Sequence, residues 1–320
     1  MTGNYDGLLL INKEPGYTSS DVVAKLRGIL RQKKIGHTGT LDPEATGLLV
    51  ICLGKATRVA ELLTAHEKEY IAVVRLGVTT DTQDMTGRIV SEGDASFVTH
   101  EILLETLGAF KGSYEQIPPM YSAVKVNGER LYKMAREGRT VERKPRTVTI
   151  SAISIMDDER LASDHEFTME VRCSKGTYIR TLCDDIGTRL GCGAAMAALI
   201  RTAVGSFRLE NASTLSEVER ARDDGTLEGL VLGIEDLFRD MDRVEVDPDF
   251  FTRLTNGNGF SPDKVVSAGP ADENDTITDE ERYRDGEIVR AYCGGIWFGL
   301  YKYSAVLKQF RVEKFFYDPA

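Results

Sequence analysis

The chain has 320 residues, 42% of them hydrophobic, which is enough for a substantial buried core and for more than one average domain. No apolar run is long enough to cross a membrane, and residues 1–6 lack a signal-peptide pattern, so we expect no membrane association and a cytoplasmic location. The five cysteines are scattered and accompanied by only four histidines. These counts argue against a disulfide framework and against a metal site.

The net charge of −10 argues, as an average, against nucleic-acid binding, because phosphate contacts require Lys and Arg. The charges are unevenly distributed, however. Residues 111–146 carry nine Lys and Arg against four Glu (+5), and residues 1–60 carry eight against five acidic residues (+3), whereas acidic residues gather after Leu215, for example in 272–285. The functional interpretation is a basic RNA-facing front and an acidic back. Charge runs alone favour the alternative, an ordinary solvated surface.

Hydrophobic periodicity predicts alternating strands and helices along the first part of the chain. In chain order we expect a strand over 7–11, a helix capped by Ser19 or Ser20 and reaching Leu30, a Gly-rich loop over 36–47, a strand over 48–53, a helix over 56–65, a strand over 68–78 and a helix over 99–110. In the strand over 68–78, Tyr70, Ala72, Val74 and Leu76 fall on one face.

The pattern changes twice further along the chain. Pro118 and Pro119 interrupt regular structure, and residues 121–146 are polar, basic and aromatic-bearing, so they look like an excursion from the fold. Strands over 147–156 and 166–173 and a helix over 177–190 follow. From residue 243 onward, acidic irregular stretches enclose short strands over 287–292, 296–301 and 310–315, which predicts a small separate β-rich domain.

Asp42 is the first candidate for chemistry. It precedes Pro43 in a loop that contains Gly36, Gly39 and Gly47, and a carboxylate on such a stiff loop suits a nucleophile. The local pattern fits a helix start equally well, with Asp42 as the N-cap and Pro43 at the first helical position. His37, in the same loop, suits an acid, a base or an aromatic wedge, although a lone loop histidine is more often none of these.

Two further residues attract attention. Tyr70 stands near a strand edge, where an aromatic ring can stack on a base, although a half-buried strand tyrosine is the commoner case. Arg180 falls in the first turn of a predicted helix, where a cation opposes the helix dipole. It therefore needs an anionic partner, and an arginine-paired carboxylate stays ionised as a nucleophile must. The alternative partner is Asp184, four residues on in the same helix.

No Walker loop, Gly-x-Gly-x-x-Gly or Gly-x-Ser-x-Gly motif is present, which weakens nucleotide-driven and serine-hydrolase functions. From the residues alone, we expect an α/β enzyme with an aspartate-centred site and a basic surface, and its function stays open. Two other classes stay open: a non-catalytic RNA-binding or RNA-folding protein, and a nucleoside hydrolase that uses an aspartate nucleophile and releases free base.

Seven segments, in order over about the first 210 residues, resemble the TruB family of tRNA pseudouridine synthases, which modify uridine 55 of the T-loop. These segments are Gly-Leu-Leu-Leu-Ile-Asn-Lys over 7–13, Gly-His-Thr-Gly-Thr-Leu-Asp-Pro-Glu-Ala-Thr-Gly-Leu-Leu over 36–49, Lys-Glu-Tyr over 68–70, Gly-Val-Thr-Thr-Asp-Thr over 77–82, Pro-Pro-Met-Tyr-Ser-Ala over 118–123, Cys-Ser-Lys-Gly-Thr-Tyr-Ile-Arg over 173–180 and Leu-Ile-Arg-Thr over 199–202. Several motifs at matching spacing are far more specific than any one of them. The C-terminal region matches only loosely.

The resemblance implies a role for each matching residue. Asp42 corresponds to the catalytic aspartate, Tyr70 to the tyrosine that stacks on the target uracil and assists proton removal, and Arg180 to the arginine paired with that aspartate. Among substrate-binding residues, His37 corresponds to the histidine that fills the space left by the flipped base, Tyr178 and Leu199 to residues that line the uracil pocket, and Lys13 to a supporting residue of the N-terminal motif.

The resemblance also implies the architecture and the partners. We expect an α+β pseudouridine synthase fold: a mixed, mainly antiparallel central sheet flanked by helices, in a catalytic domain over residues 1–242. A thumb insertion over about 118–146 would clasp the T-stem-loop of tRNA, and a PUA-like domain would cover 243–320. The family needs no cofactor, and its guide-RNA-dependent relatives generally lack the thumb, so we expect a stand-alone monomer.

Overall fold

The computed structural model describes residues 5–269 and 283–318, so most of the acidic segment 272–285 lies outside the described residues. The chain forms two compact units. One consists mainly of Leu9–Ile51 and Ala60–Leu230, and the other of residues 5–8, Cys52–Val59 and the chain from Val231 onward. Over the described ranges, no helix has the length and apolar character needed to cross a membrane.

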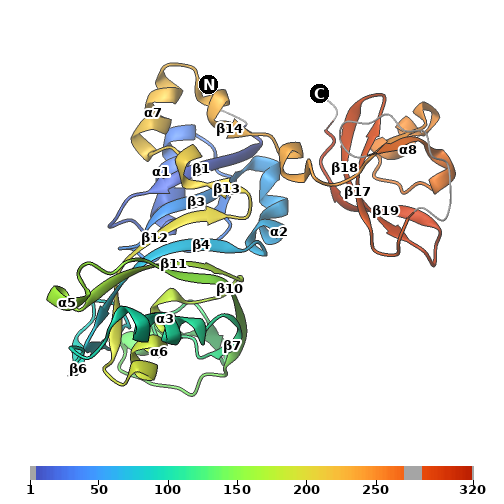
Figure 1. The fold of residues 1–320 in the computed structure, drawn as a ribbon. Coiled ribbons are helices and arrows are strands. Elements are labelled where there is room, and N and C mark those ends of the chain that lie inside the picture. The colour runs from blue at the N-terminus through green and yellow to red at the C-terminus, as the bar shows by residue number, and fades with distance from the viewer. Residues whose placement is uncertain (1–4, 270–282, 319–320) are drawn as a thin grey trace. The chain divides into compact units, whose positions relative to one another are not determined.

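Most of a mixed sheet lies in the first unit (Figure 1), while its edge strand Val231–Leu232 falls in residues assigned to the second. Its strand order is β14 (Val231–Leu232), β1 (Gly7–Lys13), β3 (Thr46–Leu53), β12 (Ala194–Val204), β4 (Lys68–Leu76), β11 (Glu166–Cys173), β10 (Arg146–Asp157) and β7 (Gly112–Gln116), with β2 (Ile35–His37) beside β3 and β13 (Phe207–Arg208) beside β12. β12 runs parallel to β3 and antiparallel to β4, and the pairing from β4 through β11 and β10 to β7 is antiparallel. This sheet and its helices confirm the predicted α+β class.

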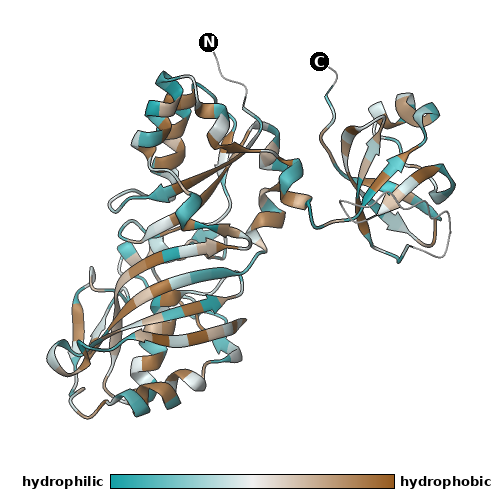
Figure 2. Cartoon of the chain, turned by 45° about the horizontal axis from the view of Figure 1, so that its top comes forward, coloured by the Kyte–Doolittle hydropathy of each residue, from teal (hydrophilic) through white to brown (hydrophobic). Residues whose placement is uncertain are grey.

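Strand β12 lies in the middle of the sheet, and the sequence pattern failed to reveal it, as it also failed to reveal β7 and α7 (Leu215–Asp223). Its Ala-rich sequence has little β propensity, and two register irregularities, between Met196 and Ala198 and between Arg201 and Ala203, interrupt the alternation of side chains. By contrast, β4 alternates buried and partly buried residues from end to end, as predicted. Figure 2 shows the corresponding apolar and polar bands along the strands.

Helices pack against the sheet through apolar stripes with the period of an α-helix. α3 (His100–Gly108) and α6 (Ile179–Leu190) lie together against the part formed by β4, β12 and β10 (Figure 1). α6 buries Ile179, Leu182, Cys183 and Ile186 in the same apolar core that contains Tyr70 and Leu199. The remaining helices of this unit are α1 (Ser19–Leu30), α2 (Ala60–Thr64), α4 (Leu131–Arg136), α5 (Leu161–Asp164) and α7 (Leu215–Asp223).

Two helix predictions need correction. The first helix is capped by Thr18 rather than by Ser19 or Ser20, because Thr18 and Asp21 form a reciprocal capping box. The predicted helix over 56–65 is instead a 3-10 segment, Gly54–Val59, followed by the short α2. Predicted strand and helix positions elsewhere in the catalytic region are confirmed to within a few residues.

Asp185 of α6 gives a test of the packing of this helix. Burial raises the pKa of its carboxyl to about 6, and the adjacent Asp184 adds to the rise. Above that pH the Asp185 carboxylate is charged in both the folded and the unfolded protein, but only the folded protein bears the cost of removing this charge from water. We therefore expect Asp185→Asn to raise the free energy of unfolding by about 1–2 kcal/mol near neutral pH, measured by urea unfolding.

The gain from Asp185→Asn should disappear as pH falls from about 6 towards about 4, because the folded wild-type protein then takes up a proton that the unfolded chain does not bind. The same change at Asp240, which is exposed, should leave the unfolding energy unaltered at both pH values. A gain that persists at the lower pH would contradict the burial explanation.

The second unit is β-rich, as predicted. Its five-stranded sheet has the order β16 (Val265–Gly269), β15 (Arg243–Val246), β17 (Ile288–Cys293), β18 (Ile296–Ser304) and β19 (Gln309–Phe315), with the short helix α8 (Phe251–Thr255). Aromatic side chains fill its core, and the Phe260 and Phe310 rings stack with centroids 4.9 Å apart.

The segment between the two sheets packs with the second unit. Arg290 of β17, which is 4% exposed, donates through Nη2 to the Arg239 carbonyl at 3.2 Å and through Nε to the Met241 carbonyl at 2.9 Å. These bonds hold residues 239–241 to the C-terminal sheet. The division into domains 1–242 and 243–320 stays a prediction. The hydrogen bonds of Arg290 to residues 239 and 241 join residues on opposite sides of that boundary.

Candidate active site

Asp42 lies in an irregular loop between β2 and β3. Residues 43–44 form a bend, stabilised by a hydrogen bond from the Ala45 amide to the Asp42 carbonyl at 3.2 Å, and β3 begins at Thr46. No helix follows Asp42, so the alternative interpretation of this residue as a helix cap is wrong. Its side chain is free of backbone capping and remains 41% exposed.

The partner of Asp42 is Arg180, at the start of α6. Arg180 Nε lies 2.9 Å from Asp42 Oδ2, and Nη2 lies 3.4 Å from Oδ1, so the guanidinium meets the carboxylate in a two-point contact. The Arg180 side chain is only 6% exposed, whereas the carboxylate is open on its other side. An ion pair between a buried cation and an accessible carboxylate leaves the carboxylate oriented and available to a ligand.

The other nitrogens of Arg180 are also occupied. Nη1 donates to the Thr82 carbonyl at 3.0 Å and Nη2 to the Tyr121 carbonyl at 2.8 Å, while Asp84 Oδ2 lies 3.7 Å from Nη1. Asp184 accepts a hydrogen bond from Gln83 instead, so the predicted alternative of an Arg180–Asp184 pair is wrong. The sequence reasoning missed Asp84, and its position two residues after a matching motif ends was the only available signal.

Tyr70 and Leu199 lie on neighbouring strands of the sheet and belong to the same apolar cluster as Leu41 of the Asp42 loop. Burial raises the pKa of the Tyr70 phenol, although the positive charge and hydrogen bond of Arg201 oppose that rise. The phenol therefore stays neutral at physiological pH. The Tyr70 side chain is 8% exposed, and its stacking on a base stays a prediction. The strand register brings Tyr70 opposite Arg201.

Arg201 is the principal residue of this region that sequence reasoning left without a role. Although only 2% exposed, it donates through Nε to the Leu48 carbonyl at 2.7 Å, through Nη1 to the Thr40 carbonyl at 3.4 Å and through Nη2 to the Gly39 carbonyl at 3.3 Å. The available signal was its place in the matching segment Leu-Ile-Arg-Thr over 199–202. A buried arginine needs several acceptors, and only the structure shows which they are. Arg201 thus holds the Asp42 loop through these backbone carbonyls.

Three more side chains hold the same loop by its backbone. Thr64 Oγ1 donates to the Thr38 carbonyl at 2.8 Å, and Ser19 Oγ accepts from the Leu41 amide at 2.9 Å. Lys13 Nζ donates to the Pro43 carbonyl at 2.9 Å. Together with Arg201, these contacts hold the loop from four different elements, so the Asp42 backbone is fixed before any ligand binds.

Lys13 has little capacity left for a ligand. It is 1% exposed, and its ammonium also donates to the carbonyls of Glu14 and Tyr17 at 3.0 and 2.6 Å. Burial lowers its pKa from the ordinary lysine value. The position suits loop support, and a direct role of Lys13 in substrate binding stays a prediction.

His37 and Tyr178 flank the site in sequence. His37 is the last residue of β2. Burial, and to a lesser extent the positive charge of Arg201, lowers the pKa of the His37 ring, so the ring is neutral at physiological pH. Within the described residues, its Nδ1 atom is buried without a hydrogen-bond partner. Tyr178 is the residue before α6, and Gln116 fixes it by accepting from its amide at 2.8 Å and donating to its carbonyl at 3.0 Å. Substrate contacts of both rings stay predictions.

The basic segment is inserted between two paired strands. Gln116 at the end of β7 lies opposite Arg146 at the start of β10, so residues 117–145 leave the sheet and return to the same place. They form a hairpin, β8 (Lys125–Val126) and β9 (Glu129–Arg130), followed by α4. The hairpin turn is Asn127-Gly128, both with positive φ, and this dipeptide was a hairpin signal in the sequence.

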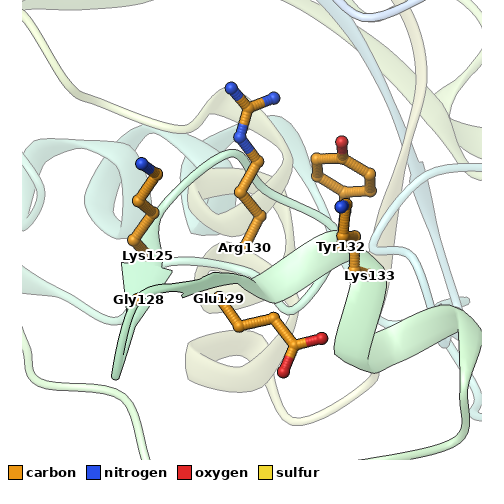
Figure 3. Close-up of a pocket in the computed structure, with 6 residues that line it drawn as sticks. All are labelled: Lys125, Gly128, Glu129, Arg130, Tyr132 and Lys133. Carbon is orange, nitrogen blue, oxygen red and sulfur yellow. The ribbon is translucent and has the colours of Figure 1, made fainter.

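The hairpin presents its cations together. Lys125, Arg130 and Tyr132 project to one side of the hairpin ribbon, and Glu129 projects to the other (Figure 3). Together they line an open hollow of about 380 Å³. The Glu129 carboxylate forms an ion pair with Arg139, whose Nη2 lies 2.8 Å from Glu129 Oε1. Among the residues described, Lys125, Arg130, Lys133 and Arg136 have no carboxylate within ion-pair distance. This surface is suited to phosphate groups.

Comparison with known proteins places the chain in a family. Residues 27–179 match the profile described as TruB family pseudouridylate synthase (N terminal domain), and residues 180–239 match the tRNA pseudouridylate synthase B C-terminal domain. The tRNA pseudouridine synthase B of Lachnoclostridium phytofermentans is 45% identical over 97% of this chain and 99% of its own length. The tRNA pseudouridine synthase B of Geobacillus thermodenitrificans is 46% identical over 79% of this chain and 84% of its own length.

A solved structure agrees at the level of the fold. One chain of an H/ACA RNP bound to a substrate RNA containing 2'-deoxyuridine has a TM-score of 0.70, 23% identity, and coverage of 98% of this chain and 85% of that one. The match of sequence over nearly the whole length, together with this fold, shows that the chain belongs to the TruB family of pseudouridylate synthases.

Proposed function

We propose that this pseudouridine synthase isomerises uridine 55 in the T-loop of tRNA, without a cofactor and without a guide RNA. The observation that carries the proposal is the two-point contact between Asp42 and Arg180, which leaves an accessible carboxylate beside the Tyr70 and Leu199 strands. Relatives that cover most of the chain are named tRNA pseudouridine synthase B, which supports tRNA as the substrate.

The reaction breaks the C–N glycosidic bond, turns the uracil in the site and joins its C5 to the sugar. An ionised Asp42 serves any of three first steps: attack on C1′, attack on C6, or proton abstraction towards a glycal. Arg180 orients the carboxylate by supplying two N–H donors. The neutral Tyr70 phenol favours stacking on the base, because burial disfavours the phenolate that a proton acceptor would need.

The uridine must leave its stack before it reaches Asp42, which costs a few kcal/mol for an ordinary base. We assign His37 to the space that the base leaves, because its ring is neutral and lies at the start of the Asp42 loop. Tyr178 and Leu199 would line the uracil pocket, and Lys13 would support the loop. Product fidelity requires that the detached base be retained by the shape of this pocket.

The inserted segment would act as a thumb that clasps the T-stem-loop. We expect the double change Lys133→Glu and Arg136→Glu to weaken tRNA binding at low salt by about 100-fold and to reduce the slope of log affinity against log salt by about 2, because two cations are replaced by anions. Fluorescence anisotropy over a salt series measures both quantities. The double change Arg189→Glu and Arg220→Glu, at exposed positions of α6 and α7, alters the net charge by the same four units and is the control. Unchanged affinity of the double variant at low salt would refute the thumb assignment.

One assay tests the function itself. The full-length protein is incubated with unmodified tRNA, and the products are separated as nucleosides with the modified position mapped. We expect pseudouridine at position 55. Release of free uracil would indicate a nucleoside hydrolase, and binding without either product would indicate an RNA-folding protein.

We further propose that the protein acts as a cytoplasmic monomer. Sedimentation with and without tRNA measures its oligomeric state directly.

A further inference from the structure

Gln83 joins the turn that carries Asp84 to helix α6, and neither the sequence motifs nor the proposed mechanism uses it. Its amide nitrogen donates to Asp184 Oδ2 at 2.8 Å, and its amide oxygen accepts from Thr181 Oγ1 at 2.9 Å. Thr181 and Asp184 are three residues apart and therefore neighbours on one helix face. Both ends of the Gln83 amide are thus satisfied by α6.

The backbone of Gln83 is held as firmly as its side chain. Its φ of 65° lies in the left-handed region, which residues other than glycine adopt infrequently. The backbone N–H of Gln83 donates to the Thr80 carbonyl at 3.3 Å, and the backbone carbonyl of Gln83 accepts from the Met196 N–H of β12 at 3.1 Å. Such a conformation persists only where the surroundings fix it, and here contacts from β12 and α6 do so.

The residues on either side of Gln83 both contact Arg180. The Thr82 carbonyl accepts from Arg180 Nη1 at 3.0 Å, and Asp84 Oδ2 lies 3.7 Å from the same nitrogen. Arg180 directly precedes Thr181, so the helix that presents the guanidinium also anchors the turn that aims it. A shift of this turn along α6 would move two of the acceptors that orient Arg180.

From these contacts we propose that Gln83 is a positioning residue, which fixes the turn 82–84 on α6 and thereby orients Arg180 towards Asp42. It touches no substrate. The inference rests on the proposed function, because it matters only if the Arg180–Asp42 pair serves the isomerisation. Gln83 would then affect the chemical step and leave tRNA binding, which uses other surfaces, unchanged.

Gln83→Gly separates this role from a structural one, because glycine adopts the left-handed backbone without strain while the amide is lost. The experiment uses full-length enzyme in saturating excess over unmodified tRNA. We expect the single-turnover rate constant of pseudouridine formation to fall about tenfold and the tRNA dissociation constant to change by less than about twofold. Single turnover at saturation reports the chemical step and is insensitive to a loss of active fraction.

Two further variants sharpen the test. Thr181→Val keeps the shape of a buried side chain but removes the donor to Gln83, so the rate should fall about threefold, and adding it to Gln83→Gly should cost nothing more. Lys308→Gly introduces the same residue at a left-handed position (φ 48°) in the second unit and should leave the rate unchanged.

A wild-type rate for both Gln83→Gly and Thr181→Val would overturn the inference, as would losses that appear only in the tRNA dissociation constant or that add fully in the double variant. If Gln83→Gly fails to fold, Thr181→Val decides by itself. A wild-type protein that forms no pseudouridine would instead overturn the proposed function. Modification at another uridine would revise the substrate and leave the test of Gln83 intact.

Discussion

Replacing Asp42 by Asn is expected to abolish pseudouridine formation, with a single-turnover rate at least about 10⁴-fold below wild type. The amide has the size of the carboxylate but lacks its charge and nucleophilicity. Because the Asp42 side chain is 41% exposed and Arg180 keeps its other acceptors, folding should be little affected. The tRNA dissociation constant should change by less than about threefold, measured by filter binding on the same preparation.

A neighbouring residue provides the control for this substitution. Glu44→Gln removes one negative charge from the same loop, at an exposed position two residues along, and should retain the wild-type rate. Substantial pseudouridine formation by Asp42→Asn would show that another group performs the first step. A parallel loss of tRNA binding and thermal stability would show that Asp42 serves the fold instead.

Replacing Arg201 by Met is expected to impair both stability and catalysis. Three backbone carbonyls, those of Gly39, Thr40 and Leu48, would lose a charged donor in a buried setting, which we expect to lower the free energy of unfolding by about 3 kcal/mol. The loosened loop carries Asp42, so the single-turnover rate should also fall by about 100-fold. Denaturant unfolding and single-turnover kinetics measure the two effects separately.

The control for Arg201 is Arg208, an arginine of the adjoining β13 whose side chain is 42% exposed. Arg208→Met should change the unfolding energy by less than about 1 kcal/mol and leave the rate near that of wild type. Arg201→Lys should fall between wild type and Arg201→Met, because an ammonium group can replace only part of the guanidinium fork. A fully active Arg201→Met enzyme would refute the support of the Asp42 loop by this residue.

The sequence by itself determined the elements whose pattern is local. The alternation along β4 placed Tyr70 on a buried face, and the 3.6-residue period of α6 placed Arg180 at the beginning of a helix. The dipole at that helix end indicated that Arg180 needs an acidic partner, and seven spaced motifs identified the family. The charge of residues 111–146 marked the inserted segment before its hairpin was known.

The tertiary structure decided which residues meet, apart from the Asp42–Arg180 pair, which the resemblance had already implied. Whether Asp42 capped a helix depended on the chain after Pro43, and pairing of β3 with β12 draws Thr46 and Gly47 into the sheet, so no helix forms there. The contacts of Arg180 with Asp42 and of Arg201 with the same loop join residues more than 130 positions apart, for which no local pattern exists. Irregular β12 hid Arg201 because its register shifts break the alternation that reveals a strand. A buried cation is stabilised by acceptors that the fold gathers from distant segments, so its partners are fixed by the assembled sheet.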